Sequence, residues 1–339
     1  MAEWACICGQ LVCLVVELAI LAKSADVFVE GAVGLARKLH LSPLIVGFVI
    51  VGFGTSAPEL CVSMLSAAQG APMLALGNAY GSNVVNVLLI LGVSMLIAPV
   101  AIHRGVFLKD LPFLLVMTVL MAAMALDGRL SVGDGLVLIG AFLLFLVYRI
   151  WDGRREVSPV ELPEMTLRRA AGYTVGGLAA LLAASQFLVW SASWLALRLT
   201  RLLGMDAATA ELITGLTVVA TGTSLPELMA SVAAMRKGFS DVALGNIVGS
   251  NCFNLCIVAG MALAIHPLAV ADTPATLWSR DVVSLLLSTL VLWLPGLALL
   301  AVSGRGRPVQ YSMGWSRIWG WVLLAGWVGY LVWVIMGSL

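Results

Sequence analysis

The sequence predicts an all-α membrane protein with ten transmembrane helices, arranged as two inverted five-helix repeats with broken helices at the centre. Three observations lead to this fold class. The chain is 61% hydrophobic and 11% charged, whereas a soluble domain is about 25% charged. Two polar motifs inside apolar segments occur twice, 168 residues apart. Lysine and arginine are concentrated in alternate connecting segments, which is typical of membrane proteins with a defined orientation.

The spans follow from the length of each apolar run, because a helix needs about 20 apolar residues to cross a bilayer. The ten predicted spans are 5–30, 43–68, 72–98, 110–126, 131–150, 171–197, 208–235, 241–265, 281–300 and 316–337. The polar linker 151–170 separates a first half, residues 1–150, from a second half, residues 171–339.

The orientation follows from the positive charges. With ten spans and the N-terminus outside, 14 of the 19 lysines and arginines lie in inside segments and 4 lie in outside segments. This is the asymmetry that the positive-inside rule describes. We therefore expect an integral protein of the cell (inner) membrane, with both termini outside and a cytoplasmic central linker.

The polar motifs form an internal repeat. GTSAPEL at 54–60 returns as GTSLPEL at 222–228, and ALGN at 75–78 returns at 243–246. Residues 52–92 and 220–260 share 17 identities over 41 ungapped positions. Five spans separate equivalent points, so the two copies run in opposite directions through the membrane. Inverted repeats that meet at broken helices are typical of secondary transporters.

The first motif combines a helix break with oxygen ligands. Proline has no N–H, so Pro58 and Pro226 each deprive a carbonyl of its helical hydrogen bond. In hydrocarbon a freed carbonyl needs another partner, such as protein, water or an ion. Glu59 and Glu227 each place a charge there that costs about 2.5–3.5 kcal/mol at a helix centre, which favours a function. The hydroxyls beside the two breaks are those of Thr55, Ser56, Thr223 and Ser224.

The second motif adds neutral oxygens from the next helix. Ser82 and Asn86 are four residues apart and share a helix face, and so do Ser250 and Asn254. The pooled candidates are carboxylates, amides, hydroxyls and carbonyls, all of which suit Ca²⁺, a cation that takes about 6–8 oxygens. Soft ligands are missing from this set, which makes copper or zinc less favourable.

These motifs resemble the α-repeats of the calcium/cation antiporter family, the sodium/calcium exchangers. GTSxPE in one span and GSNxxN in the next, repeated in inverted halves, carry the resemblance. SADVFVEGA at 24–32 and SPLIVG at 42–47 are also similar to that family. The short linker indicates a prokaryotic-type member without a regulatory domain. The resemblance implies two five-helix halves with the ion site between them, and a first and a sixth span that slide across it.

The resemblance also implies the ligands. Calcium would be bound by Glu59 and Glu227 with Thr55 and Thr223. Sodium would use the same two glutamates, four serines and the carbonyls near two helix breaks, and two asparagines would complete the centre. These further residues are Ser56, Ser82, Ser224, Ser250, Gly52, Ala220, Asn86 and Asn254.

The sequence departs from the family at one corner of the site. Several members have Asp at the position of Asn254, whereas this chain has Asn at both 86 and 254. Two readings therefore stay open: a secondary antiporter that exchanges Ca²⁺ for Na⁺ by alternating access, or one that couples Ca²⁺ or another cation to protons. A channel or a non-transporting membrane protein is a more distant alternative.

No enzymatic activity is expected, because the chain shows no nucleophile–base set, metal-protease motif or nucleotide loop. We expect no cofactor, since Ca²⁺ and Na⁺ would be transported ions. The expected partners are these ions or H⁺ and the lipid bilayer, without nucleic acid or a protein partner.

Overall fold

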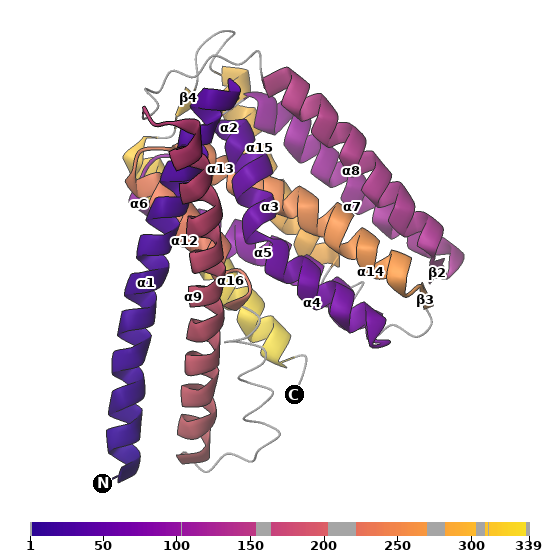
Figure 1. Ribbon diagram of the computed structural model, residues 1–339. Helices are drawn as coiled ribbons and strands as arrows, with labels where there is room; N and C mark the ends of the chain where they lie inside the picture. Colours follow the sequence, from indigo (N-terminus) through magenta and orange to yellow (C-terminus); the bar gives the residue numbers. More distant parts are fainter. Residues whose placement is uncertain are drawn as a thin grey trace.

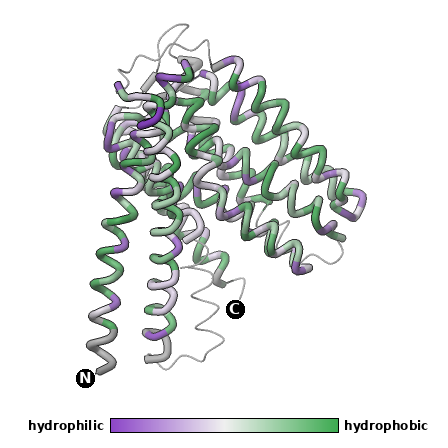
Figure 2. The backbone as a smooth tube through the Cα atoms, in the orientation of Figure 1, coloured by the Kyte–Doolittle hydropathy of each residue, from purple (hydrophilic) through white to green (hydrophobic). Residues whose placement is uncertain are grey.

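The computed structural model describes residues 2–102, 104–153, 164–202, 222–269, 282–302, 309–310 and 312–336, and within them the protein is almost entirely helical. Among the described residues, six helices are long and apolar enough to cross a membrane. They are 72–97, 106–127, 132–152, 167–198, 240–265 and 313–334. A seventh candidate is the bent pair 43–55 and 57–68. Figure 2 shows apolar residues over most of the length of the long helices. The predicted all-α membrane class is confirmed.

The elements of the first half follow one another without a long loop (Figure 1). They are α1 (Ala2–Leu39), α2 (Pro43–Val46), η1 (Gly47–Val51), α3 (Gly52–Thr55), α4 (Ala57–Ala68), α5 (Pro72–Val85), η2 (Asn86–Leu91), α6 (Gly92–Ile97), β1 (Ala101–Ile102), η3 (Val106–Asp110), α7 (Leu111–Met124), η4 (Ala125–Asp127), β2 (Arg129–Leu130) and α8 (Val132–Gly153).

The described elements of the second half are α9 (Leu167–Leu202), α12 (Leu225–Arg236), α13 (Ser240–Phe253), η6 (Asn254–Val258), α14 (Ala259–Ile265), β3 (Leu268–Ala269), α15 (Val283–Val302), β4 (Val309–Gln310) and α16 (Met313–Met336). Two short antiparallel ladders, β1 with β4 and β2 with β3, join the first half to the second.

The predicted bounds of the first span were wrong. The first helix covers 38 residues instead of 5–30, about 57 Å of helix, so it extends well beyond the hydrocarbon. Arg37 and Lys38 in its last turn are basic residues that favour a helix C-terminus. Two helices extend into the predicted linker 151–170, since α8 continues to Gly153 and α9 begins at Leu167. Of the predicted span 208–235, residues 208–221 lie outside the described residues.

The helices α1 and α9 lie side by side over most of their length (Figure 1). Their backbones touch because glycine stands at the contact: a Cβ on Gly31 would lie 2.4 Å from Thr174 N, and one on Gly177 would lie 2.6 Å from Phe28 N. Towards the other end of the pair, Ser191 donates a hydrogen bond of 2.7 Å to Glu17. Residue 31 of α1 thus lies beside 174 of α9, 28 beside 177, and 17 beside 191. The residue numbers fall along α1 as they rise along α9, so the two helices are antiparallel.

The internal repeat is visible in the secondary structure. At the offset of 168 residues, α4 (Ala57–Ala68) matches α12 (Leu225–Arg236), and α5 matches α13 residue for residue. A π-helical turn follows in both copies, beginning at Asn86 and at Asn254. The glycines of the two links also correspond, with φ of 79° at Gly70 and 81° at Gly238. The repeated sequence therefore folds into repeated local structure.

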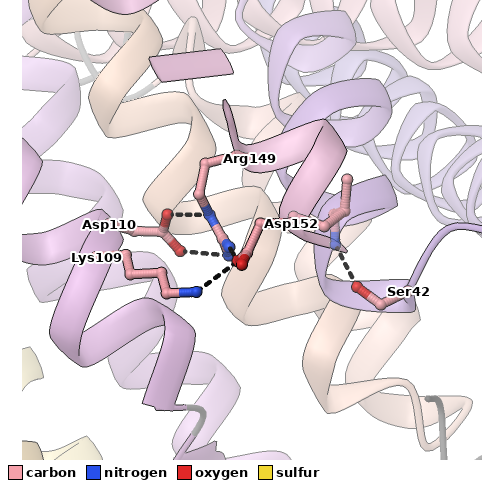
Figure 3. Close-up of polar contacts among 6 residues, drawn as sticks. Ser42, Lys109, Asp110, Arg149 and Asp152 are labelled. Atoms are coloured by element: carbon pink, nitrogen blue, oxygen red, sulfur yellow. Dashed lines mark hydrogen bonds and ion pairs between the residues drawn. The ribbon is translucent and has the colours of Figure 1, made fainter. Parts of the chain in front are cut away.

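A buried ion-pair cluster ties η3 to the end of α8 (Figure 3). The guanidinium of Arg149 is fully buried and binds both oxygens of Asp110, with Nε–Oδ1 at 2.5 Å and Nη2–Oδ2 at 3.1 Å. Asp152 lies 2.7 Å from Arg149 and 2.6 Å from Lys109. Two charges buried this deeply are tolerated because they are paired and hydrogen-bonded.

Candidate functional site

Both predicted helix breaks are present. The bent pair that carries the first break turns by 44° between 43–55 and 57–68. At the break Ser56 has φ −83° and ψ 7°, outside the helical region, and Ser224 matches it with φ −90° and ψ 8°. Pro58 and Pro226 lie at the first positions of the half-helices that follow, where the missing N–H costs nothing.

Each half-helix carries its glutamate in the first turn. Glu59 lies there in α4 and Glu227 in α12. A helix N-terminus has unpaired N–H groups and a positive dipole end, so it favours a carboxylate. The Glu59 and Glu227 side chains are 0% and 1% exposed, and neither forms an ion pair with a basic residue in the described part of the chain.

The two carboxylates are joined across the repeat. Ser56 Oγ of the first copy donates to Glu227 Oε1 at 2.9 Å, and Ser224 Oγ of the second copy donates to Glu59 Oε1 at 3.4 Å. Each carboxylate thus has one oxygen held by the opposite copy. The other oxygen, Oε2 in both residues, is buried and has no hydrogen-bond partner among the described residues. The structure brings the four predicted residues of the two breaks together.

The threonines beside the breaks are not equivalent. Thr55 Oγ1 lies 3.0 Å from Val51 O and 3.2 Å from Asn246 Oδ1. Thr223 Oγ1 is buried and has no partner among the described residues. Of the two predicted carbonyl ligands, that of Gly52 accepts from Ser250 Oγ at 3.2 Å. The other residue, Ala220, lies outside the described residues.

The predicted amides lie one helix further on. Asn86 Nδ2 donates to Asn251 Oδ1 at 2.9 Å, and Asn86 Oδ1 has no partner in the part of the chain that the structure describes. In that same part, Asn254 is fully buried and neither of its amide atoms has a partner. Ser82 and Ser250, one turn earlier, are 3% and 0% exposed. Buried amides without partners are costly, so they point to a species that would satisfy them.

The sequence interpretation missed four asparagines. Asn83 and Asn251 donate to each other's backbone carbonyls, at 3.1 and 3.5 Å, and so link the two copies. Asn78 and Asn246 each donate to the backbone carbonyl of a site glutamate, at 3.2 and 3.1 Å. All four belong to the repeated segments ALGN and GSN, so the repeat itself was the signal.

The arrangement suits a hard cation. Five buried oxygens of the predicted ligands have no hydrogen-bond partner in the described part of the chain: Glu59 Oε2, Glu227 Oε2, Thr223 Oγ1, Asn86 Oδ1 and Asn254 Oδ1. Such carboxylate, hydroxyl and amide oxygens are the ligands that Ca²⁺ takes. The two carboxylates would balance the charge of one divalent cation.

Comparison with known proteins gives consistent results. The sodium/calcium exchanger protein family matches residues 9–151 and 169–336. The chain is 39% identical to a protein of Alkalimonas amylolytica named as an antiporter, CaxA, over 94% of this chain and 96% of that one. It is 28% identical to the sodium/calcium exchanger MaX1 of Methanosarcina acetivorans, over 76% and 84% of the two chains.

A solved structure has the same fold. The sodium-calcium exchanger NCX_Mj, soaked with Na⁺ and Sr²⁺, superposes with a TM-score of 0.76. The two chains are 26% identical, and the match covers 98% of this chain and 99% of that one.

Proposed function

Since this chain belongs to the sodium/calcium exchanger protein family, we propose that it is a secondary antiporter that moves Ca²⁺ across the membrane in exchange for Na⁺. One observation carries this proposal: two buried carboxylates face each other across a repeated helix break, and each keeps one oxygen without a partner. Membership of a family of exchangers supports transport, rather than an enzymatic reaction, as the role of these residues.

The proposed calcium ligands are Glu59 and Glu227 with Thr55 and Thr223. Sodium would use the same glutamates with Ser56, Ser82, Ser224, Ser250 and the carbonyls of Gly52 and Ala220, and Asn86 and Asn254 would complete the centre. The hydroxyls of Ser56 and Ser224 already touch the carboxylates, at 2.9 and 3.4 Å, which supports their place in the set. No resident cofactor is part of the proposal.

Exchange would result from competition for one site. Two carboxylates left empty would stand buried with no compensating charge, which is costly in hydrocarbon. A Ca²⁺ ion or several Na⁺ ions would remove that charge, so that only the filled site could pass through the occluded state. Binding one ion type would thereby exclude the other, and the gradient of one would drive the other.

The proposed architecture is the inverted ten-helix one, with halves 1–150 and 171–339 and a linker at 151–170. The antiparallel packing of α1 and α9 supports inversion, since these are the first helices of the two halves. This pair would slide across the site. The chain would lie in the inner membrane with both termini outside, as the positive charges indicate, and we propose no protein partner.

One feature of the site favours H⁺, in place of Na⁺, as the ion that is exchanged for Ca²⁺. Asn occupies both 86 and 254, so the described site holds two carboxylates only. Two protons on Glu59 and Glu227 would neutralise the site as fully as one Ca²⁺ ion does. Proton-coupled transport of Ca²⁺, or of another cation, is therefore the alternative that the experiment must separate.

The test is Ca²⁺ uptake into proteoliposomes loaded with Na⁺ and diluted into Na⁺-free buffer, with a second arm that carries only a pH gradient. Glu59→Gln should abolish uptake. Glu164→Gln is the matched control, because Glu164 is exposed in the linker and pairs only with Arg37 among the described residues.

Uptake that needs internal Na⁺ and disappears in Glu59→Gln is the expected result. Uptake that follows the pH gradient alone would mean that the protein exchanges Ca²⁺ for H⁺ and not for Na⁺. Without uptake under either gradient, the proposed function would be wrong.

A further inference from the structure

Asn78 and Asn246 occupy equivalent positions in α5 and α13, next to the ion site but outside the predicted ligand set. The amide nitrogen of Asn78 donates to Glu59 O at 3.2 Å and to Ser63 Oγ at 3.0 Å. That of Asn246 donates to Glu227 O at 3.1 Å and to Ser231 Oγ at 2.8 Å. Each asparagine therefore holds the half-helix that carries a site glutamate.

These donor bonds fix the direction of each amide oxygen. Because Nδ2 is turned towards the glutamate carbonyl, Oδ1 must point the other way. In Asn246, which is fully buried, Oδ1 lies 3.2 Å from Thr55 Oγ1, in the segment that precedes the break of the first copy. A single side chain thus connects the glutamate half-helix of one copy to the threonine of the other.

The equivalent hydrogen bond between Thr223 and Asn78 is not formed. Thr223 Oγ1 is buried and has no partner among the described residues, although Asn78 makes the same two donor bonds as Asn246. The serines show the same imbalance: Ser56 reaches Glu227 at 2.9 Å, but Ser224 reaches Glu59 only at 3.4 Å. The hydrogen bonds that Asn78 and Asn246 donate are the same in both copies. The hydrogen bond that Asn246 accepts from Thr55 has no counterpart at Asn78 among the described residues.

The segment 52–56 packs closely against α13. A Cβ on Gly52 would lie 3.0 Å from Ser250 N and 3.2 Å from Asn246 O. Ser250 Oγ, moreover, donates to Gly52 O at 3.2 Å. In this conformation two hydrogen bonds join the segment before the first break to α13, one at Gly52 and one at Thr55.

We propose that Asn78 and Asn246 are positioning residues of the exchanger, and that the Thr55–Asn246 hydrogen bond is exchanged for a Thr223–Asn78 hydrogen bond when the site changes its side of access. This inference rests on the proposed function. In a protein built from two equivalent copies, the opposite state is obtained by exchanging their roles. Each state then keeps one of the two bonds, so neither bears the cost of losing both, and the two states stay close in free energy.

Hydrogen exchange in lipid nanodiscs tests this without requiring transport. Asn246→Ala and Asn78→Ala remove the same two donor bonds, but only Asn246→Ala also removes an acceptor from Thr55. Amide exchange across residues 52–56 should be about five to ten times faster in Asn246→Ala than in Asn78→Ala, the factor that corresponds to one hydrogen bond. Thr55→Val and Thr223→Val form a second pair, in which only Thr55→Val should speed up exchange there.

A transport readout separates positioning from a general loss of structure. Asn246→Ala should destabilise the state described above and Asn78→Ala the opposite one. The ratio of the Ca²⁺ KM values at the two membrane faces should therefore shift in opposite directions in the two variants. A merely structural role would change the Ca²⁺ KM values at both membrane faces by the same factor.

Equal exchange rates across 52–56 in both alanine variants, or no effect of Thr55→Val, would overturn the inference. If Ca²⁺ flux is absent under every gradient, the proposed function fails, but the hydrogen-exchange comparison still decides whether the Thr55–Asn246 bond holds residues 52–56.

Discussion

Removal of the buried guanidinium of Arg149 should be among the most damaging substitutions outside the ion site. Arg149 is 0% exposed and Asp110 is 1% exposed, and they make a two-point contact. Arg149→Met keeps much of the apolar stem but leaves the Asp110 carboxylate buried without this partner. Breaking such a pair by removing one member costs about 3–5 kcal/mol.

Two further variants make the prediction specific. Arg149→Met combined with Asp110→Leu removes both charges and should recover most of the loss, because the uncompensated carboxylate is gone. Lys109→Met is the matched control: its side chain is 34% exposed, so the pair with Asp152 contributes about 0–1 kcal/mol.

The assay is thermal inactivation in detergent, followed as a half-life at fixed temperature, because membrane proteins of this kind unfold irreversibly as a rule. From longest to shortest, the expected half-lives are those of the wild type, Lys109→Met, the double variant and Arg149→Met. A half-life of Arg149→Met equal to that of Lys109→Met would refute the reasoning, and so would a double variant less stable than Arg149→Met.

Three other predictions concern packing and the site. Gly245→Ala should destabilise the protein by about 1–3 kcal/mol, because its Cβ would lie 2.2 Å from Leu44 O. Gly140→Ala is the control and should be neutral, because its Cβ meets no described atom within 4 Å; the half-lives of thermal inactivation of the two variants are compared. Ser56→Ala should raise the Na⁺ concentration for half-maximal exchange more than Ser224→Ala does, since its bond to a carboxylate is 2.9 Å against 3.4 Å; an equal rise in Na⁺-dependent flux measurements would contradict this. Ca²⁺ at a hundred times its Kd should stabilise the fold by about 2.7 kcal/mol, which should lengthen the half-life of thermal inactivation in the wild type but not in Glu59→Gln.

The features that depend on local chemistry could be predicted from the sequence. Pro58 and Pro226 lack an N–H wherever the chain places them, so the two breaks were predictable. The apolar runs dictated helices, and a constant offset of 168 residues dictated that both copies share one local structure. Glu59 and Glu227 were placed at the breaks because they follow the prolines directly.

What depends on distant contacts could not be predicted. The sequence spacing of Asp110 and Arg149 gives no sign that they meet, since the contact joins η3 to the end of α8. Asn78 and Asn246 were visible as repeated residues, but their bonds to the glutamate carbonyls require the packing of neighbouring helices. The difference between Thr55 and Thr223 belongs to one conformation, and two equal motifs cannot encode it.

The central claim is that one site, held jointly by both copies of the repeat, binds Ca²⁺ and Na⁺ in competition. It is tested most directly by calorimetric titration of Ca²⁺ into the purified protein, into Glu59→Gln and into Glu227→Gln, each with and without Na⁺. We expect one Ca²⁺ ion per chain, an apparent Ca²⁺ affinity that falls as the Na⁺ concentration rises, and a loss of Ca²⁺ affinity of at least about thirtyfold in both variants. Ca²⁺ binding that survives in either variant, or that Na⁺ leaves unchanged, would contradict it.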